Sequence, residues 1–357
     1  MEKIKINKLP GQTWNRLGMN DVSVDDFPFE DGLKAQIRED GAPWEEEKEA
    51  LDETREAEFS SMETALGENF TNLLNEAKSA RVISFEARPG EQKTYRTEFS
   101  FEGGARCARQ EFRALPGSQL TIFQYYDGEG KVLGGRAGIQ TLIRAQAGAN
   151  VKLVQIFTAL GETECLNDVG AALEEGAALE VDQIFLGGKS TVSGTMVNLT
   201  GRKASFASNV AYDLEAGENL DLNLVARHVG KKTEAQIDVK GVLRKGSKKL
   251  LRATVDFISG CSGSVGQEAE EVLLMDEEVV NQTIPLILCG EEDVEGAHGA
   301  SIGRINEEHL FYMKSRGISE EQIYEMLASA RIETVLGRIG DEETSERVRK
   351  HGKYVLR

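Results

Sequence analysis

Cysteine, proline and tryptophan are scarce in this chain of 357 residues, with 4, 6 and 2 copies. The cysteines are far apart and form no CxxC pair, which argues against both a disulfide framework and a zinc motif. Reduced thiols are typical of the cytoplasm, and we expect the protein to be cytoplasmic. The cysteines are Cys107, Cys165, Cys261 and Cys289.

Long hydrophobic runs are also missing. The first residues, MEKIKINKLPGQTW, lack the apolar stretch of a secretory signal peptide, and no run approaches the roughly 18 residues of a membrane helix. Basic residues are outnumbered, with 42 Lys and Arg against 60 Asp and Glu and a net charge of -18. Nucleic acids and membranes are therefore not expected as partners.

Common catalytic motifs are absent as well. The sequence contains no GxxxxGK[ST], no GxSxG elbow and no HExxH, so we do not expect an enzyme. One enzymatic alternative is a β-helix protein that acts on polysaccharide, with acids such as Asp293 and Glu295 as acid and base. Such an enzyme would need an aromatic-lined groove, but Trp14 and Trp44 lie outside the β-rich region.

No proline interrupts the span from Gly117 to Ile284, and this span carries the signal for β-structure. Short runs rich in β-branched and aromatic residues recur there, separated by Gly, Asn and Asp turns. No convincing amphipathic helix pattern lies between them. The predicted strands cover residues 120–126, 139–144, 151–157, 178–186, 220–228, 235–243 and 250–258.

A weak repeat accompanies the strands. A glycine stands three residues before an apolar-x-apolar strand start in GSQLTI, GANVKL, GAALEV and GENLDL, with a looser echo in GSKKLL. These glycines, at positions 117, 148, 176, 217 and 246, are 31, 28, 41 and 29 residues apart. Such spacing favours a β-solenoid in which each unit adds one coil. A β-sandwich or barrel would also space its strands regularly and stays open here.

The N-terminal part of the chain has a different pattern. Residues 39–58 are dominated by acids, and apolar residues then follow with the i, i+3, i+4 spacing of a helix. These apolar residues are Phe59, Met62, Leu66, Phe70, Leu73 and Leu74. We therefore predict an N-terminal helical region over residues 1–80 and a β core over residues 81–309.

A helical C-terminal domain is predicted over residues 310–357. Ser319 stands three residues before Gln322, which is the spacing of a capping box at a helix start. A second, charged helix is expected over residues 341–350. An apolar stripe on the first helix is either the core of this domain or a surface on which a partner docks. The stripe consists of Ile323, Met326, Leu327 and Ala330.

Potential metal ligands are concentrated between Asn281 and Gly317. Cys289 ends an apolar run, four acids follow within six residues, and His298 stands among small residues. A thiolate and an imidazole suit iron and other borderline metals, and carboxylates can add oxygen ligands. In a second interpretation, Cys289 is simply a buried apolar residue and His298 hydrogen-bonds a turn.

In this same segment the chain resembles the SufB/SufD family of iron–sulfur cluster assembly proteins. The resemblance lies in Pro285, the Asp293-Val294 pair, HGAS from His298 to Ser301, Gly303, and LFYMKSRGIS from Leu310 to Ser319. The stretch LPGQTWNRLGMN, at residues 9–20, is similar to the start of SufD-type members. The resemblance therefore touches both ends of the chain.

The resemblance implies a mainly β fold, with a right-handed parallel β-helix core flanked by N-terminal and C-terminal α-helical regions. It further implies a scaffold subunit of a SufBCD complex, which pairs with a SufB-like subunit through the β-helix. The C-terminal helices would bind SufC, an ABC-type ATPase, here through the apolar stripe and Ser319. An iron–sulfur cluster would form transiently at the subunit interface, and none is expected to be stably bound by the isolated chain, which could form a homodimer.

Within this family, the histidine of the SufD HGA motif, here His298, is associated with cluster assembly. SufB-type members carry Glu after this histidine and a cysteine before the proline, whereas here Gly299 follows and residues 276–284 contain no cysteine. The chain therefore resembles the D type most closely. Cys289 lies after Pro285 and is assigned to the metal site by proximity alone. A self-pairing SufB-like scaffold that uses only SufC is the alternative.

Overall fold

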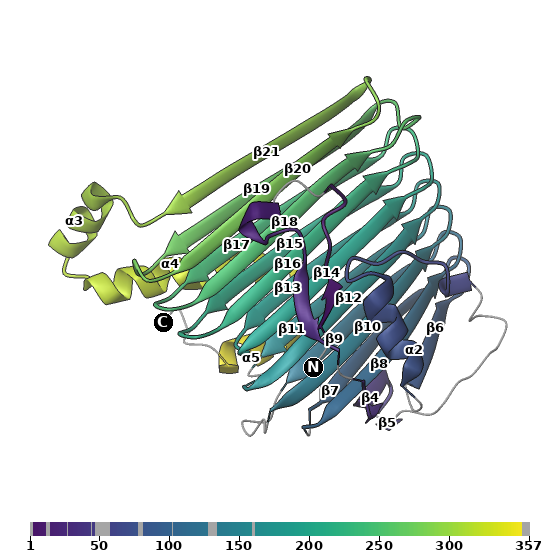
Figure 1. Cartoon of the computed structure of the whole chain (residues 1–357), viewed down its shortest axis with the longest axis horizontal. Helices are drawn as coiled ribbons and strands as arrows, with labels where there is room; N and C mark the ends of the chain where they lie inside the picture. The colour runs from purple at the N-terminus through teal and green to yellow at the C-terminus, as the bar shows by residue number, and fades with distance from the viewer. Residues whose placement is uncertain are drawn as a thin grey trace.

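The computed structural model describes residues 3–11, 15–26, 28–43, 45–46, 58–77, 81–101, 103–127, 134–158 and 161–351. Both tryptophans, most of the acid-rich stretch and residues 352–357 lie outside this part. The described residues are mainly β-structure, and their strands form a parallel β-solenoid of about seven turns (Figure 1). The fold predicted from the sequence is confirmed.

From β6 onward, the strands alternate between two facing sheets, with even-numbered strands in sheet 1 and odd-numbered strands in sheet 2. Neighbouring strands of this run are parallel and in register, so equivalent side chains stack from coil to coil. Sheet 1 contains β6 (Arg81–Ala87), β8 (Ala105–Ala114), β10 (Gly135–Ala145), β12 (Thr163–Leu173), β14 (Ser190–Leu199), β16 (Asn219–His228), β18 (Lys248–Phe257) and β20 (Val280–Cys289). Sheet 2 contains β7 (Gln92–Ser100), β9 (Gln119–Asp127), β11 (Asn150–Thr158), β13 (Ala178–Leu186), β15 (Ser205–Leu214), β17 (Glu234–Leu243), β19 (Ser264–Leu274) and β21 (Val294–Gly303).

The repeated glycines do form turns, but the turns belong to two different edges of the solenoid. Gly117, Gly148 and Gly176 each connect a sheet 1 strand to the next sheet 2 strand, with φ between 65° and 69°. Gly217 and Gly246 lie at the opposite edge, where sheet 2 strands lead back to sheet 1. The irregular spacing of 41 residues arises because the repeat changes edge there.

Lysine takes the place of glycine further along the first edge. Lys203 and Lys232 have φ values of 60° and 57°. Their N–H groups donate to the carbonyls of Lys231 and Ser262 in the following coils, just as Gly117 donates to Ala147. A positive φ costs a non-glycine residue about 1 kcal/mol. Stacking between coils offsets this cost, and the glycine signal disappears from the sequence at these two turns.

The core between the sheets contains an aromatic ladder. Neighbouring rings of the ladder stack with centroids 5.0, 4.2 and 4.6 Å apart. Tyr212 continues the column, and its ring fills the space that Gly241 leaves in the next coil. The four stacked rings are Phe99, Tyr126, Phe157 and Phe185.

A ladder of buried amides runs beside the aromatic rings. Gln155 Nε2 donates to Gln124 Oε1 at 2.7 Å, and Gln183 Nε2 donates to Gln155 Oε1 at 2.6 Å. Buried amides are costly unless they are hydrogen-bonded, so a shift in register would break these bonds. The ladder therefore favours one alignment of the coils.

In the residues that the structure describes, the N-terminal region combines helix with short strands. Helix α2 (Glu68–Glu76) is present, but short strands account for much of the rest of the described region. Apolar residues of the predicted helix, such as Phe59 and Leu66, are buried outside α2. Glu58 and Phe59 are helical, whereas Leu66 is not, so helical periodicity accounts for only part of this spacing in the described residues. The short strands are β1 (Lys3–Ile6), β2 (Val22–Asp25), β3 (Asp31–Gly32), β4 (Lys34–Glu39) and β5 (Glu45–Glu46).

Outward-facing polar side chains of sheet 1 hold this N-terminal segment in place. Arg252 is fully buried, and its guanidinium donates to the carbonyl of Met19 and to Asp221, both at 2.6 Å. The N–H of Leu66 donates to the buried carboxylate of Asp168 at 3.0 Å. Arg252 therefore serves the fold, because it joins the N-terminal segment to sheet 1.

The C-terminal region is helical, with α3 (Glu307–Ser315), α4 (Glu320–Ile339) and α5 (Glu342–His351). The predicted capping box is present, because Ser319 Oγ accepts from the N–H of Gln322 and Gln322 Oε1 accepts from the N–H of Ser319. Helices α4 and α5 pack on the outer face of sheet 2. Within the described residues, no helix is both long and apolar enough to cross a membrane.

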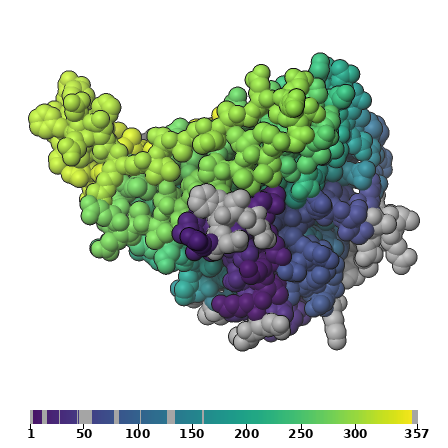
Figure 2. All heavy atoms as spheres, turned by 45° about the horizontal axis from the view of Figure 1, so that its top comes forward, coloured from purple at the N-terminus to yellow at the C-terminus, as the bar shows by residue number. Residues whose placement is uncertain are grey.

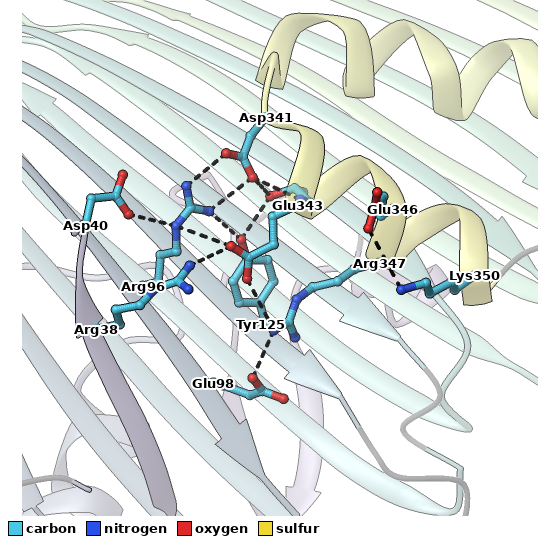
Figure 3. A network of polar contacts seen from close by, with 11 residues as sticks. Arg38, Asp40, Arg96, Glu98, Tyr125, Asp341, Glu343, Glu346, Arg347 and Lys350 are labelled. Atoms are coloured by element: carbon cyan, nitrogen blue, oxygen red, sulfur yellow. Dashed lines mark hydrogen bonds and ion pairs between the residues drawn. The ribbon is translucent and has the colours of Figure 1, made fainter. Parts of the chain in front are cut away.

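An ion-pair network ties α5 to the strands at the start of the solenoid (Figure 3). Arg96 on β7 donates to both oxygens of Asp341, at 3.0 and 2.9 Å, and to Tyr125 Oη at 2.9 Å. Arg347 on α5 donates to Glu98 at 3.0 Å. Helices α4 and α5 are thus fixed along the sheet, whereas α3 stands away from it (Figure 1).

Candidate functional site

The last coil of the solenoid, β20 and β21, is open to solvent. No residue of β21 is fully buried, whereas strands of the central coils are almost entirely buried. Each of the two strands pairs on one side only, β20 with β18 and β21 with β19. Figure 2 brings this end of the molecule forward, with α3 projecting at the left. Strands with a free edge readily pair with another chain.

His298 lies in the middle of β21, with its side chain exposed, and not in a turn. Its in-register neighbour is Glu268 on β19, whose own neighbour on β17 is the core residue Ile237. Because in-register side chains of neighbouring strands share a face, His298 continues a column that faces the core. It is exposed because the described chain adds no coil beyond it.

Cys289 lies at the end of β20 and is exposed, so it is not the buried residue of the second interpretation. A Cβ placed on Gly296 would lie 3.0 Å from Ile287 Cγ2, which shows that these two positions face each other across the coil. Pro285 therefore faces His298, and Cys289 lies four residues further along, a separation of roughly 13 Å. The structure does not bring Cys289 and His298 together within one chain.

His228 is buried two coils below Cys289 in the same column. Its ring stacks on Phe257 with centroids 4.7 Å apart, and Nδ1 lies 2.7 Å from Thr233 Oγ1. Burial lowers the pKa of His228 to about 4. The folded protein therefore keeps this imidazole neutral at a pH where the unfolded chain, with a pKa of about 6.5, takes up a proton.

This difference predicts a specific loss of stability in acid. Above about pH 6.5, the neutral His228 makes its full contribution to the free energy of unfolding. As the pH falls toward 4, about 2–3 kcal/mol of this free energy is lost. We expect His228→Gln, which cannot titrate, to lose less stability than the wild type between pH 7 and pH 4.5. Urea unfolding at both pH values measures the difference, and equal losses in the two proteins would contradict the prediction.

A charged cluster is buried beneath the last coil. Lys249 Nζ forms an ion pair with Glu270 and donates to Thr283 Oγ1 at 2.9 Å. The hydroxyl of Thr283 donates to Glu270 Oε2 at 2.7 Å. The side chains of Lys249 and Glu270 have no exposed surface. Lys249 therefore balances the charge of Glu270, and Thr283 donates a hydrogen bond to it.

Glu268 is the second acid of this cluster, and it is only 6% exposed. It has no hydrogen-bond partner among the residues that the structure describes. Burial and the neighbouring Glu270 raise the pKa of Glu268 to about 7, although Lys249 opposes the rise. A buried carboxyl that lacks a partner lowers stability as the pH rises through the range from about 4.5 to 7, which marks it as a candidate functional group.

The chain offers few metal ligands at any one place. In the described ranges, no group of three or more His, Cys, Asp and Glu side chains could hold a metal ion. At the open coil, His298 and Glu268 are neighbours, and Cys289 is remote from both. A cluster bound here would need further ligands from elsewhere.

The predicted docking residues on α4 have different environments. Ser319 forms the helix cap, and Ile323 is fully buried in the packing of α4, so Ile323 is not available to a partner. Leu327 is half-buried, whereas Met326 and Ala330 are exposed. The surface that a partner could contact is therefore narrower than the predicted stripe.

Two exposed aromatic residues lie on α3, the helix that precedes α4. Helix α3 has no buried residue, and its Phe311 and Tyr312 are 75% and 57% exposed. Exposed large apolar residues on a projecting element are typical of binding surfaces. The sequence prediction did not assign them to docking, although a Phe-Tyr pair within a charged helix was a readable signal.

The chain is similar to known proteins of one family. The family profile described as "SUF system FeS cluster assembly, SufBD core domain" matches residues 101–331. An iron–sulfur cluster assembly SufBD family protein of Mycobacterium leprae is 30% identical over 166 residues, which cover 46% of this chain and 19% of the relative.

Two relatives from Bacillus subtilis match this chain at similar identity. Its iron–sulfur cluster assembly protein SufD is 27% identical over 164 residues, and its SufB is 29% identical over 160 residues. Each alignment covers 45% of this chain, but only 37% of SufD and 34% of SufB. The identities do not separate the two subtypes, but the profile covers well over half of the chain. The chain belongs to the SufBD family of iron–sulfur cluster assembly proteins.

Proposed function

We propose that this chain is a non-enzymatic, D-type scaffold subunit of a SufBCD complex in the cytoplasm. The open last coil carries the proposal, because it presents two free strand edges and His298 on one surface. A second β-solenoid that docks there would continue both sheets and cover the exposed end of the core. Gly299 after His298, and no cysteine in residues 276–284, support the D type.

At this interface the chain would bind a nascent cluster as cargo. His298 supplies a neutral imidazole, and its position in the middle of β21 fixes the direction of that ligand. The partner would supply thiolate ligands, since Cys289 is too far from His298 to share a metal ion with it.

The second proposed partner is the ATPase SufC, which would dock on α3 and the start of α4. Phe311, Tyr312 and Met326 expose apolar surface there, and α3 projects clear of the solenoid. Helices α4 and α5 are held on sheet 2 by packing and by the Arg96 network. A movement of the ATPase bound at α3 would therefore be transmitted through α4 and α5 to the solenoid.

Two matched variants test the two surfaces separately. Phe311→Asp should weaken SufC binding at least tenfold and leave pairing with the SufB-like subunit intact, because a charge replaces an apolar contact. Ile302→Asp, at the 44% exposed Ile302 of the last coil, should have the opposite pattern. Co-purification of tagged wild-type and variant chains with each partner gives the readout. If neither variant changes either interaction, both proposed surfaces are wrong.

Self-pairing is the alternative within the family, and the same surface could serve it. It predicts that the chain assembles with SufC alone and supports cluster formation without a SufB-like subunit. Size-exclusion chromatography of the chain with SufC, followed by iron and sulfide analysis, distinguishes this alternative from the D-type proposal.

A further inference from the structure

The side chains of His298 and Glu268 occupy adjacent positions at the open end of the solenoid. They are in-register partners on β21 and β19, so both point to the inner side of sheet 2. Neighbouring strands are about 4.8 Å apart, which allows an imidazole nitrogen and a carboxylate oxygen to approach a common ion. Ala297 and Gly299 flank His298 and leave its ring accessible.

Of the two buried acids, only Glu268 is free to bind a ligand. Glu270 interacts with Lys249 and Thr283, so its charge and its hydrogen-bonding capacity are already used. Glu268 is 6% exposed and has no hydrogen-bond partner in the described part of the chain. With both acids ionised, Lys249 balances only one of the two charges. The uncompensated carboxylate lies beside His298 and favours a cation.

We propose that Glu268 and His298 together form a two-ligand site for a divalent metal ion, through which this chain binds iron directly. The inference deepens the proposed function and rests on it for the choice of iron. An imidazole with a carboxylate suits divalent iron, cobalt, manganese and zinc. Water would complete the coordination in the isolated chain, and ligands from the second subunit would replace it in the complex.

The site also explains why an unpartnered acid is retained in the core. A buried carboxylate normally costs stability unless a cation or hydrogen bonds compensate it. A metal ion at His298 would supply that compensation. Replacement by the neutral isostere in Glu268→Gln should therefore leave the melting temperature of the metal-free chain unchanged or higher.

Cobalt(II) is a suitable probe, and its visible absorption reports the ligands. We expect the isolated, full-length chain to bind one Co²⁺, and Glu268→Gln and His298→Ala each to weaken binding at least tenfold. Glu271→Gln is the matched control, since Glu271 lies on the same strand, β19, but faces outward. It should bind Co²⁺ like the wild type. Wild-type affinity in Glu268→Gln would overturn the proposal, as would a wild-type chain that binds no Co²⁺.

Two further measurements separate this proposal from the proposed function. If Glu268→Gln does not fold, Glu268→Asp is tested in its place, because it retains the carboxylate and should still bind Co²⁺. A Co²⁺ affinity of Glu268→Asp as weak as that of His298→Ala would overturn the site. Cluster maturation in cells tests the scaffold function independently. If His298→Ala loses Co²⁺ binding but supports normal maturation, the proposed function is refuted and the site is supported. If His298→Ala keeps Co²⁺ binding but does not support maturation, only the site is refuted.

Discussion

Replacement of His298 by alanine is expected to reduce cluster maturation in cells at least tenfold, while the chain still folds and binds its partners. The imidazole is exposed and has no hydrogen-bond partner among the described residues, so its loss should change stability by no more than about 0.5 kcal/mol. Its loss would, however, remove the imidazole ligand that this chain places at the centre of the open coil. Activity of an iron–sulfur enzyme in a Suf-dependent strain measures the effect.

His351→Ala is the matched control for this experiment. His351 is also exposed, but it lies at the end of α5, away from the last coil. It should support normal maturation, and pull-down of both partners by each variant shows that assembly is intact. Normal maturation by His298→Ala would exclude His298 from the proposed function.

Replacement of Lys249 by methionine should lower the free energy of unfolding by about 3–5 kcal/mol. The substitution removes the counter-ion of the buried Glu270 and leaves the hydrogen bond from Thr283 in place. Such uncompensated charge is among the most destabilising changes in a core. Urea unfolding at pH 7 measures the loss.

Two variants identify the cause of this loss. Lys249→Met combined with Glu270→Leu removes both charges and should recover most of the lost stability, because the desolvation cost disappears with the pair. Lys248→Met changes the exposed neighbour and should cost less than about 0.5 kcal/mol. If Lys249→Met is as stable as the wild type, the buried ion pair does not hold this end of the core together.

Local patterns were sufficient to predict much of the fold. Runs of β-branched and aromatic residues indicated strands that the structure confirms, for example at residues 151–157 within β11 and residues 235–243 within β17. Ser319 and Gln322 indicated the start of α4, because a capping box depends only on residues three apart. These signals act over a few residues, so they can be read without the tertiary structure.

Patterns set by contacts between distant residues were missed. Lys203 and Lys232 occupy turns where the repeat predicts glycine, because stacked coils tolerate a positive φ there. Leu66 fits the helical spacing of its neighbours but lies outside a helix, and it is buried where its N–H donates to Asp168, 102 residues further along the chain. Periodicity alone cannot distinguish these cases.

By itself, the sequence determined the β-solenoid class and the family, and it made His298 a candidate, since each of these depends on local patterns or a short motif. Only the tertiary structure decided which residues accompany His298. Glu268 is 30 residues away in sequence and becomes its neighbour through the register of β19 and β21, whereas Cys289, nine residues away, lies at the far end of its strand. A solenoid brings together residues one coil apart, and within a coil it brings together only residues at facing positions, so proximity in sequence did not predict these neighbours.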